Sequence, residues 1–183
     1  CYGNITLSGV STTLQNSTFS KITILGADGA SNIVADAFSG GACTSVIIGP
    51  NITIGDRAFS NCTALKNVQL PETTMTIAHG LFQNCKSLES IIIPNNVTSI
   101  GDQALYNCTS LSSIRIGSNI KSWGKQIFYG CSGTLYIDSN IISLPEKDGA
   151  FYGSKFLSLT LGPHVTEIGS YAFYGTGLRS IEI

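Results

Sequence analysis

Charge is scarce in this sequence. Lysine and arginine together contribute 10 residues and aspartate and glutamate 11, so charged side chains make up 11% of the 183 residues, against about 25% in an average soluble protein. The formal net charge is −1. A chain this close to neutral lacks the basic surface that nucleic acids and anionic membranes attract, so we expect no nucleic-acid partner. Serine, threonine, asparagine and glycine must cover most of the surface.

Long apolar runs are missing as well. Hydrophobic residues make up 43% of the chain, but no run approaches the roughly 18 residues that would cross a bilayer, so we expect no direct membrane insertion. No basic segment followed by an apolar one opens the chain, as a secretory leader would, which suggests a mature or trimmed chain. The length suits a single domain, residues 1–183, with a substantial core.

One large apolar residue recurs along the whole chain. From Phe59 to Phe151 the step is 23 residues every time, and the flanking steps are 19, 21 and 22. Such regular spacing is the signature of a solenoid whose repeated side chains stack in columns. The members of this column are Phe19, Phe38, Phe59, Phe82, Leu105, Phe128, Phe151 and Phe173.

Each repeat also contains two extended segments and a bend. An apolar pair with period two, such as Ile91/Ile93, predicts a strand, and nine such rungs would form one parallel sheet about 40 Å long at about 4.8 Å per strand. A second, shorter strand follows, as in 97–100. The bend Ile100-Gly101-Asp102 comes next, where Asp102 is expected to cap a short helical turn that buries the column residue. Asp56 takes the same role two repeats earlier. His79 and Lys125 occupy this position without being good caps, so we expect their turns to be less regular.

The repeat resembles a known family. The pattern Pro-x-x-Val-Thr-x-Ile-Gly-x-x-Ala-Phe-x-x-Cys-x-x-Leu-x-x-Ile-x-Ile is carried by residues 94–116, 51–70 and 163–183. It resembles the BspA-like (Treponema-type) leucine-rich repeat, and the resemblance covers nearly the whole chain, more loosely before Ser45. It implies a leucine-rich-repeat solenoid with a parallel sheet on one face and short strands and helical turns on the others. It also implies a surface or secreted protein, implicated in adhesion, and it names no catalytic residues.

Four cysteines share one repeat position. Cys62, Cys85, Cys108 and Cys131 are 23 residues apart, which predicts a line of stacked side chains. Zinc needs ligands that converge on one point, and stacked neighbours lie farther apart than a disulfide requires, so we expect buried, reduced thiols that act as small hydrophobes. Cys1 and Cys43 are off this register.

Catalytic constellations are absent from the pattern. His79 and His164 lie in different repeats at different positions, without a paired nucleophile, and the 11 carboxylates are scattered. We therefore expect no enzyme activity, no cofactor and no metal.

Two groups of outward-facing residues are candidates for binding. Ile92, Arg115 and Tyr136 stand on consecutive rungs of the predicted sheet, where an apolar, a cationic and an aromatic side chain together form a possible hot spot. The alternative is a merely solvated sheet face. A second group follows the apolar column on four consecutive repeats: Tyr106, Tyr129, Tyr152 and Tyr174. These tyrosines are suited to protein or glycan contact, or else they stack on one another and stabilise the edge.

The sequence thus favours an adhesion or recognition module outside the cell, which binds an extracellular protein or glycan. A passive stalk that spaces other domains is the alternative. Six Asn-x-Ser/Thr sequons, at Asn4, Asn16, Asn51, Asn61, Asn96 and Asn107, would be glycosylation acceptors only in a eukaryotic secretory pathway. The last rung, 181–183, ends in mid-repeat with an unpaired edge. We expect a fragment of a longer repeat protein, or an end that self-associates or is covered by a partner.

Overall fold

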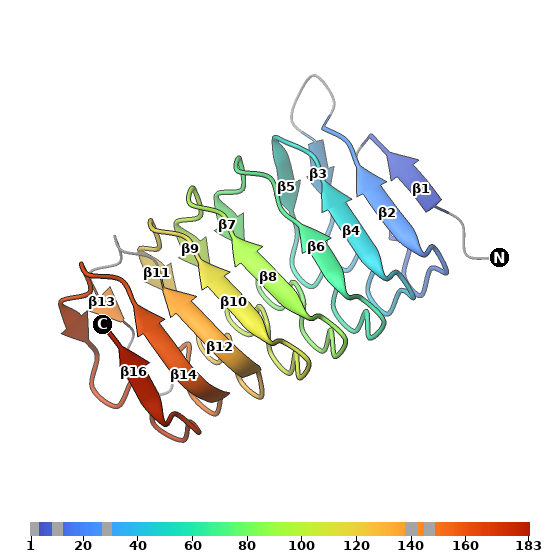
Figure 1. Ribbon diagram of the computed structural model, residues 1–183. Coiled ribbons are helices and arrows are strands. Elements are labelled where there is room, and N and C mark those ends of the chain that lie inside the picture. The colour runs from blue at the N-terminus through green and yellow to red at the C-terminus, as the bar shows by residue number, and fades with distance from the viewer. Residues whose placement is uncertain (1–3, 9–12, 27–30, 138–142, 145–148) are drawn as a thin grey trace.

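The structure, a computed structural model, describes residues 4–8, 13–26, 31–137, 143–144 and 149–183. The chain winds into a stack of coils, with its two termini at opposite ends (Figure 1). Each complete coil contributes a front strand, a shorter back strand and a turn segment. Among the described residues, no helix is long and apolar enough to cross a membrane.

The front of the stack consists of parallel strands. Neighbouring strands pair in the register that the sequence pattern predicts, with Ile91 beside Ile114 and Ile114 beside Leu135. The front strands are β1 (Asn4–Leu7), β2 (Lys21–Ile24), β4 (Ser45–Ile48), β6 (Asn67–Gln69), β8 (Ser90–Ile93), β10 (Ser113–Ile116), β12 (Ser132–Ile137), β14 (Lys155–Leu161) and β16 (Ser180–Glu182). These are the nine expected rungs.

The expectation of one continuous front sheet is wrong. The strands form two sheets, β1-β2-β4-β6 and β8-β10-β12-β14-β16, with no ladder between β6 and β8. After β10 a glycine extends the pairing, since the N–H of Gly117 donates to the carbonyl of Ile93 over 2.9 Å. After β8 this position is Pro94, which has no N–H to donate to Leu70. Pro71 holds the same position after β6, and β6 still pairs with β4, so the proline removes one bond and does not by itself account for the break.

The back of the stack is also interrupted. The back strands are β3 (Ser31–Ile33), β5 (Ile52–Ile54), β7 (Thr76–Ile77), β9 (Ser99–Ile100), β11 (Ser122–Trp123), β13 (Ser143–Leu144) and β15 (Glu167–Ile168). They pair as β3-β5, β7-β9-β11 and β13-β15. The coil that holds β6 and β7 therefore pairs through its front strand with the preceding coil and through its back strand with the following one.

The core is a set of side-chain columns between front and back. The rings of Phe38 and Phe59 stack with centroids 5.2 Å apart and planes 3° from parallel, and Phe128 and Phe151 stack at 5.6 Å. Phe59 and Phe82 stack at 6.0 Å, and buried Leu105 continues the column toward Phe128. The expected shared hydrophobic column is confirmed.

The expected helical turns are wrong, because the described residues contain no helix. The turn segments instead form a ladder along the stack. The alternate N–H groups of Arg57, Phe59 and Asn61 donate to the carbonyls of His79, Leu81 and Gln83 in the next coil. The N–H groups between them bond three residues back within the coil, as Ser60 does to Arg57. Donors that serve the neighbouring coil cannot also serve an α-helix.

The expected capping role of aspartate is wrong for the same reason. Oδ1 of Asp56 accepts a hydrogen bond from the N–H of His79 over 3.1 Å, and Oδ1 of Asp102 accepts from the N–H of Lys125 over 2.8 Å. Each carboxylate therefore bonds the next coil and not its own turn. The turns that begin at His79 and Lys125 make the same ladder bonds as the others, so the expectation that they are less regular is also wrong.

Glycine at the bend is required for space. Gly101 is absent from the residues with positive φ, so its backbone conformation is open to other residues. However, a Cβ on Gly101 would lie 2.7 Å from the backbone nitrogen of His79 in the preceding coil. The glycine thus lets the N–H of residue 101 reach the carbonyl of Ile77, 2.8 Å away.

The cysteines form a buried column of free thiols. They do more than fill space, because each Sγ donates to a carbonyl of the preceding coil: Cys62 to Phe38, Cys85 to Phe59, Cys108 to Phe82 and Cys131 to Leu105. Burial raises the pKa of the Cys85 thiol well above its ordinary value, and burial followed by the contact with Cys131 raises the pKa of the Cys108 thiol. Cys43, predicted to be off register, is buried in the same core. Cys1 lies outside the described residues.

Candidate functional site

The front-face residues Ile92, Arg115 and Tyr136 lie side by side on β8, β10 and β12, as the sequence predicts. The guanidinium carbon of Arg115 stands 5.3 Å from the ring centroid of Tyr136, which is a cation–π contact between neighbouring strands. Ile92 is 65% exposed beside them. Together they give the front sheet a small apolar and cationic patch in an otherwise polar, weakly charged face.

The four predicted tyrosines form one stacked column along the turn edge. Tyr106 and Tyr129 stack at 4.8 Å with planes 6° apart, Tyr129 and Tyr152 meet at 6.4 Å and 32°, and Tyr152 and Tyr174 stack at 6.4 Å and 13°. Exposure is 37% at Tyr129 and 54% at Tyr174. The rings therefore stabilise one another and still present their outer edges to solvent, so the two uses that the sequence left open are compatible.

The space for this column comes from glycine in the next coil. Gly153 has φ +67°, and a Cβ there would lie 2.5 Å from two ring carbons of Tyr129. Earlier coils carry asparagine at this position, where side-chain amides bond from coil to coil: Nδ2 of Asn84 donates to Oδ1 of Asn61 over 2.9 Å, and Asn107 to Asn84 over 3.0 Å. The edge thus changes from an amide ladder to an aromatic column toward the C-terminus.

Two exposed apolar side chains near this region were missed in the sequence. Leu157, 53% exposed, is the extra residue of a bulge in β14, where Gly133 pairs with Phe156 but Thr134 pairs with Ser158. Two apolar residues in succession, Phe156 and Leu157, break the period-two pattern and were the available signal. Tyr171, 69% exposed, contacts Tyr174 edge to face at 6.3 Å. The other coils carry a polar residue or glycine at this repeat position, so the repeat pattern gave no signal for an exposed aromatic side chain there.

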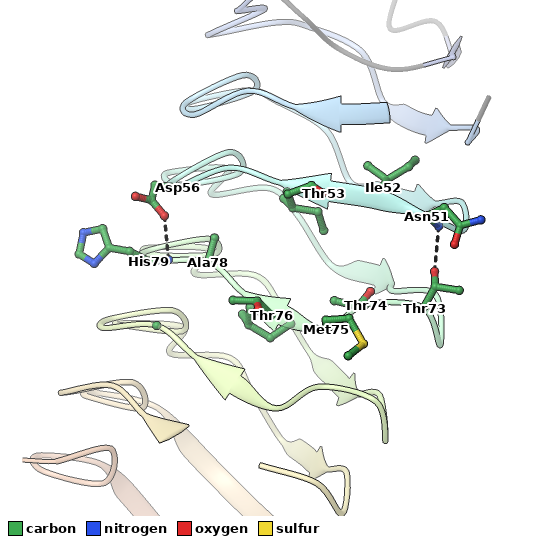
Figure 2. Close-up of a pocket in the computed structure, with 13 residues that line it drawn as sticks. Asn51, Ile52, Thr53, Asp56, Thr73, Thr74, Met75, Thr76, Ala78 and His79 are labelled. Atoms are coloured by element: carbon green, nitrogen blue, oxygen red, sulfur yellow. Dashed lines mark hydrogen bonds between the residues drawn. The ribbon is translucent and has the colours of Figure 1, made fainter. Parts of the chain in front are cut away.

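Hollows lie at two of the breaks between sheets. One, of about 240 Å³, lies on the front between β6 and β8 and is lined by Gln69 and Ile92, among others. A larger one of about 560 Å³ lies on the back between β5 and β7 (Figure 2). Within the described part of the chain, no three His, Cys, Asp or Glu side chains are grouped so as to hold a metal ion.

Comparison with solved structures shows the same fold. A leucine-rich-repeat protein of Treponema pallidum matches with a TM-score of 0.67 and 23% identity, over 88% of this chain and 79% of that one. A leucine-rich-repeat protein of Bacteroides ovatus matches with a TM-score of 0.55 and 19% identity, over 96% of this chain and 65% of that one. The pneumococcal vaccine antigen PcpA matches with a TM-score of 0.53 and 19% identity, over 100% of this chain and 51% of that one. A leucine-rich cell surface protein of Faecalibacterium prausnitzii matches with a TM-score of 0.51 and 23% identity, over 81% of this chain and 32% of that one.

No curated protein sequence matches the chain. The family model for the BspA type leucine rich repeat region matches residues 31–147 and 133–183 in six copies. This match spans most of the chain and agrees with the stacked coils, the Phe column and the buried cysteines. The chain therefore belongs to the BspA-type leucine-rich-repeat family.

Proposed function

We propose that this chain is a recognition module, displayed on a cell surface or secreted, that binds a macromolecular partner and performs no reaction. The tyrosine column carries the proposal. Tyr106, Tyr129, Tyr152 and Tyr174 present a continuous row of partly exposed aromatic rings, held in place by mutual stacking. A rigid aromatic row loses little side-chain entropy on binding, which makes it suited to contact with a protein or a glycan.

Two further observations support this proposal. The patch of Ile92, Arg115 and Tyr136 adds a pre-ordered cation–aromatic pair on the adjacent front face. Among the structural relatives, one is described as a cell surface protein and another as a vaccine antigen, which supports a location outside the cell. A passive stalk is the second candidate, and it would need neither feature.

The test uses purified extracellular matrix proteins and a glycan array against the immobilised chain. The double variant Tyr129→Ser/Tyr152→Ser should weaken binding of the captured partner at least about tenfold, or 1.4 kcal/mol. The matched control is Gln83→Ser, which changes the same repeat position two coils before Tyr129. Thermal unfolding shows whether each variant is folded. If no partner is captured, the chain is a stalk; if affinity is unchanged in the folded double variant, the tyrosine column is not the binding surface.

The C-terminal end offers a separate route to association. Among the described residues, the last front strand, β16, pairs with β14 alone, and Ile181 and Ile183 are 43% and 91% exposed. We infer that this edge pairs with a second copy of the chain. Sedimentation that shifts with protein concentration, and stops shifting in Ile181→Lys, would support the second copy; a monomer at every concentration would contradict it.

A further inference from the structure

The back cleft between β5 and β7 is a gap in the solenoid that is closed at both ends. At one end Oδ1 of Asp56 accepts from the N–H of His79 over 3.1 Å. At the other, the N–H of Asn51 donates to Oγ1 of Thr73 over 2.9 Å. Figure 2 shows these two contacts on either side of the opening, with Thr53 above and Thr74 and Thr76 below. The cleft between them holds about 560 Å³.

One methyl group explains the cleft. In neighbouring coils the bend residue is a glycine whose N–H bonds the preceding back strand, as Gly55 does to Ile33 and Gly101 to Ile77, both over 2.8 Å. In the coil of β7 this residue is Ala78. A Cβ at the equivalent Gly55 or Gly101 would lie 2.6 or 2.7 Å from backbone nitrogen of the coil before. Ala78 carries such a Cβ, so its coil cannot approach β5, and the described residues show no ladder between β5 and β7.

The opened strands leave hydrogen-bonding groups without protein partners. The backbone hydrogen bonds of the described residues include none from Ala78 N–H to Ile54, the counterpart of the bond between Gly101 and Ile77. Thr74 lines the cleft, is only 3% exposed, and its Oγ1 has no hydrogen-bond partner. A buried hydroxyl without a partner costs about 1–3 kcal/mol. The Oγ1 atom is itself buried, so a ligand pairs with it only once the side chain turns toward the cleft, and that pairing recovers this cost.

The lining combines hydroxyls, a carboxylate and an apolar surface. Thr53 and Thr76 are exposed at the cleft and Asp56 stands at one end. Met75, which is 57% exposed, and Ile52 supply apolar surface from opposite sides. The edges of β5 and β7 that face the cleft do not pair with each other. The backbone donors and acceptors of such edges suit a group that both donates and accepts, and the hydroxyl is such a group. A sugar ring offers several hydroxyls and apolar C–H faces at once, and the volume lies in the usual range for small-molecule sites.

An inserted peptide strand fits less well. A strand paired on both sides would need β5 and β7 to stand about 9.6 Å apart, twice the usual spacing. The bonds between Asp56 and His79 and between Asn51 and Thr73 tie the coils together at both ends of the cleft. The turn ladder bond from Arg57 N–H to the His79 carbonyl, 2.8 Å, adds a third tie.

We propose that the cleft between β5 and β7 binds one hydroxylated sugar ring, either a free monosaccharide or the terminal unit of a glycan. Thr74 and Asp56 contact its hydroxyls, and Met75 packs on its apolar face. This site lies on the back of the solenoid and does not depend on the tyrosine column.

The experiment is a titration followed by two-dimensional amide NMR, with free hexoses, N-acetylhexosamines and their methyl glycosides as probes. At least one sugar should shift amides of residues 51–56 and 73–79 at up to about 20 mM, a range that detects even millimolar binding. Binding of the free sugar but not of its glycoside identifies a free monosaccharide, and binding of the glycoside identifies a terminal unit.

Two variants test the geometry. Ala78→Gly removes the methyl that holds the cleft open and should lower affinity at least about tenfold, while new protection from exchange appears at residue 78. Thr74→Val keeps the shape of the side chain and removes its hydroxyl, so it should also weaken sugar binding. This variant tests the proposal even if Ala78→Gly does not fold. Thr134→Val, an exposed change on β12, is the control and should bind as the parent does.

Several outcomes would overturn the proposal. One is that no sugar shifts any amide, or that the shifted amides lie outside the cleft. Another is that folded Ala78→Gly binds the sugar with the affinity of the parent. A third is that an extended peptide shifts these amides and sugars do not. Sugar shifts at these amides with no macromolecule captured by the chain would leave this site standing without the proposed function. A captured macromolecule with no sugar shift would leave only the proposed function.

Discussion

The thiol of Cys108 donates a hydrogen bond to the carbonyl oxygen of Phe82, 3.1 Å away in the preceding coil. The same contact recurs at Cys62, Cys85 and Cys131, so the cysteine column bonds each coil to the one before. We expect Cys108→Ala to lower the free energy of unfolding by about 1–3 kcal/mol, because it removes both a buried donor and buried volume. Urea unfolding measures this loss. The exposed neighbour Thr109→Ala is the control; an equal effect at both sites would mean that the thiol contributes nothing specific.

The raised thiol pKa values predict how stability depends on pH. Burial raises the pKa of Cys85 and is the leading cause at Cys108. Above the ordinary thiol pKa the unfolded chain therefore loses thiol protons that the folded chain keeps. The unfolded state then binds fewer protons, so the free energy of unfolding falls as pH rises above about 8.5, by up to about 1.4 kcal/mol per unit and thiol. Below that pH these thiols contribute no slope.

Chemical unfolding between pH 7 and 10 tests this directly. Replacing Cys85 by alanine should reduce the slope of unfolding free energy against pH by the contribution of about one proton. The other titrating groups are the same in the parent and the variant, so their contributions cancel in the comparison. A slope that is the same in parent and variant would show that the Cys85 thiol ionises equally in the folded and unfolded states.

Much of this fold could be predicted from spacing. The step of 23 residues between Phe59 and Phe151 placed the aromatic column, and the apolar alternation placed the front strands in register. The breaks could not be predicted in this way. Ala78 is a single change from the repeat's glycine that leaves the hydrophobic periodicity intact and acts through backbone contact between coils.

The turn conformation was mispredicted because helices and β-turns share their local signals. An aspartate shortly before a buried apolar pair is typical of a helix N-cap. Asp102 has this sequence context, and yet its carboxylate bonds the next coil instead. The repeat spacing placed the tyrosines correctly on one line. Their stacking also depends on the orientation of the rings, which the spacing does not specify. The choice between binding and stacking therefore stayed open until Tyr106 and Tyr129 were seen face to face.

Gly101 should behave as the counterpart of Ala78. A Cβ at residue 101 would lie 2.7 Å from His79 N, so Gly101→Ala should push β9 from β7 and cost about 1–3 kcal/mol of unfolding free energy. The amide at residue 101, which bonds the Ile77 carbonyl, should lose its protection from hydrogen exchange. Gly177→Ala is the control, because a Cβ there would meet nothing closer than 3.8 Å. Retained protection in Gly101→Ala would contradict the spacing argument for the back cleft.

Gly153 allows a separate measurement of the tyrosine column. Gly153 and Gly175 have φ of +67° and +73°, so alanine at either position carries a similar backbone strain of about 1–2 kcal/mol. Only at Gly153 would the new Cβ collide with Tyr129, at 2.5 Å, whereas at Gly175 the nearest atoms are 3.9 Å away. Gly153→Ala should therefore be the more destabilising change and should shift the ring signals of Tyr129 in NMR spectra. Equal effects would mean that the ring moves aside without cost.

The carboxylate of Asp102 should stabilise the stack through the coil that follows it. Its Oδ1 is the acceptor for Lys125 N–H at 2.8 Å, so Asp102→Ala leaves that donor to water and should lower the free energy of unfolding by about 1–2 kcal/mol. Asp102→Asn keeps an oxygen in place and should recover most of the loss. Hydrogen exchange at the Lys125 amide locates the effect, since an N-cap within the coil would instead protect amides of residues 104–105. Faster exchange at those two amides, with Lys125 unchanged, would restore the capping role and contradict the ladder between coils.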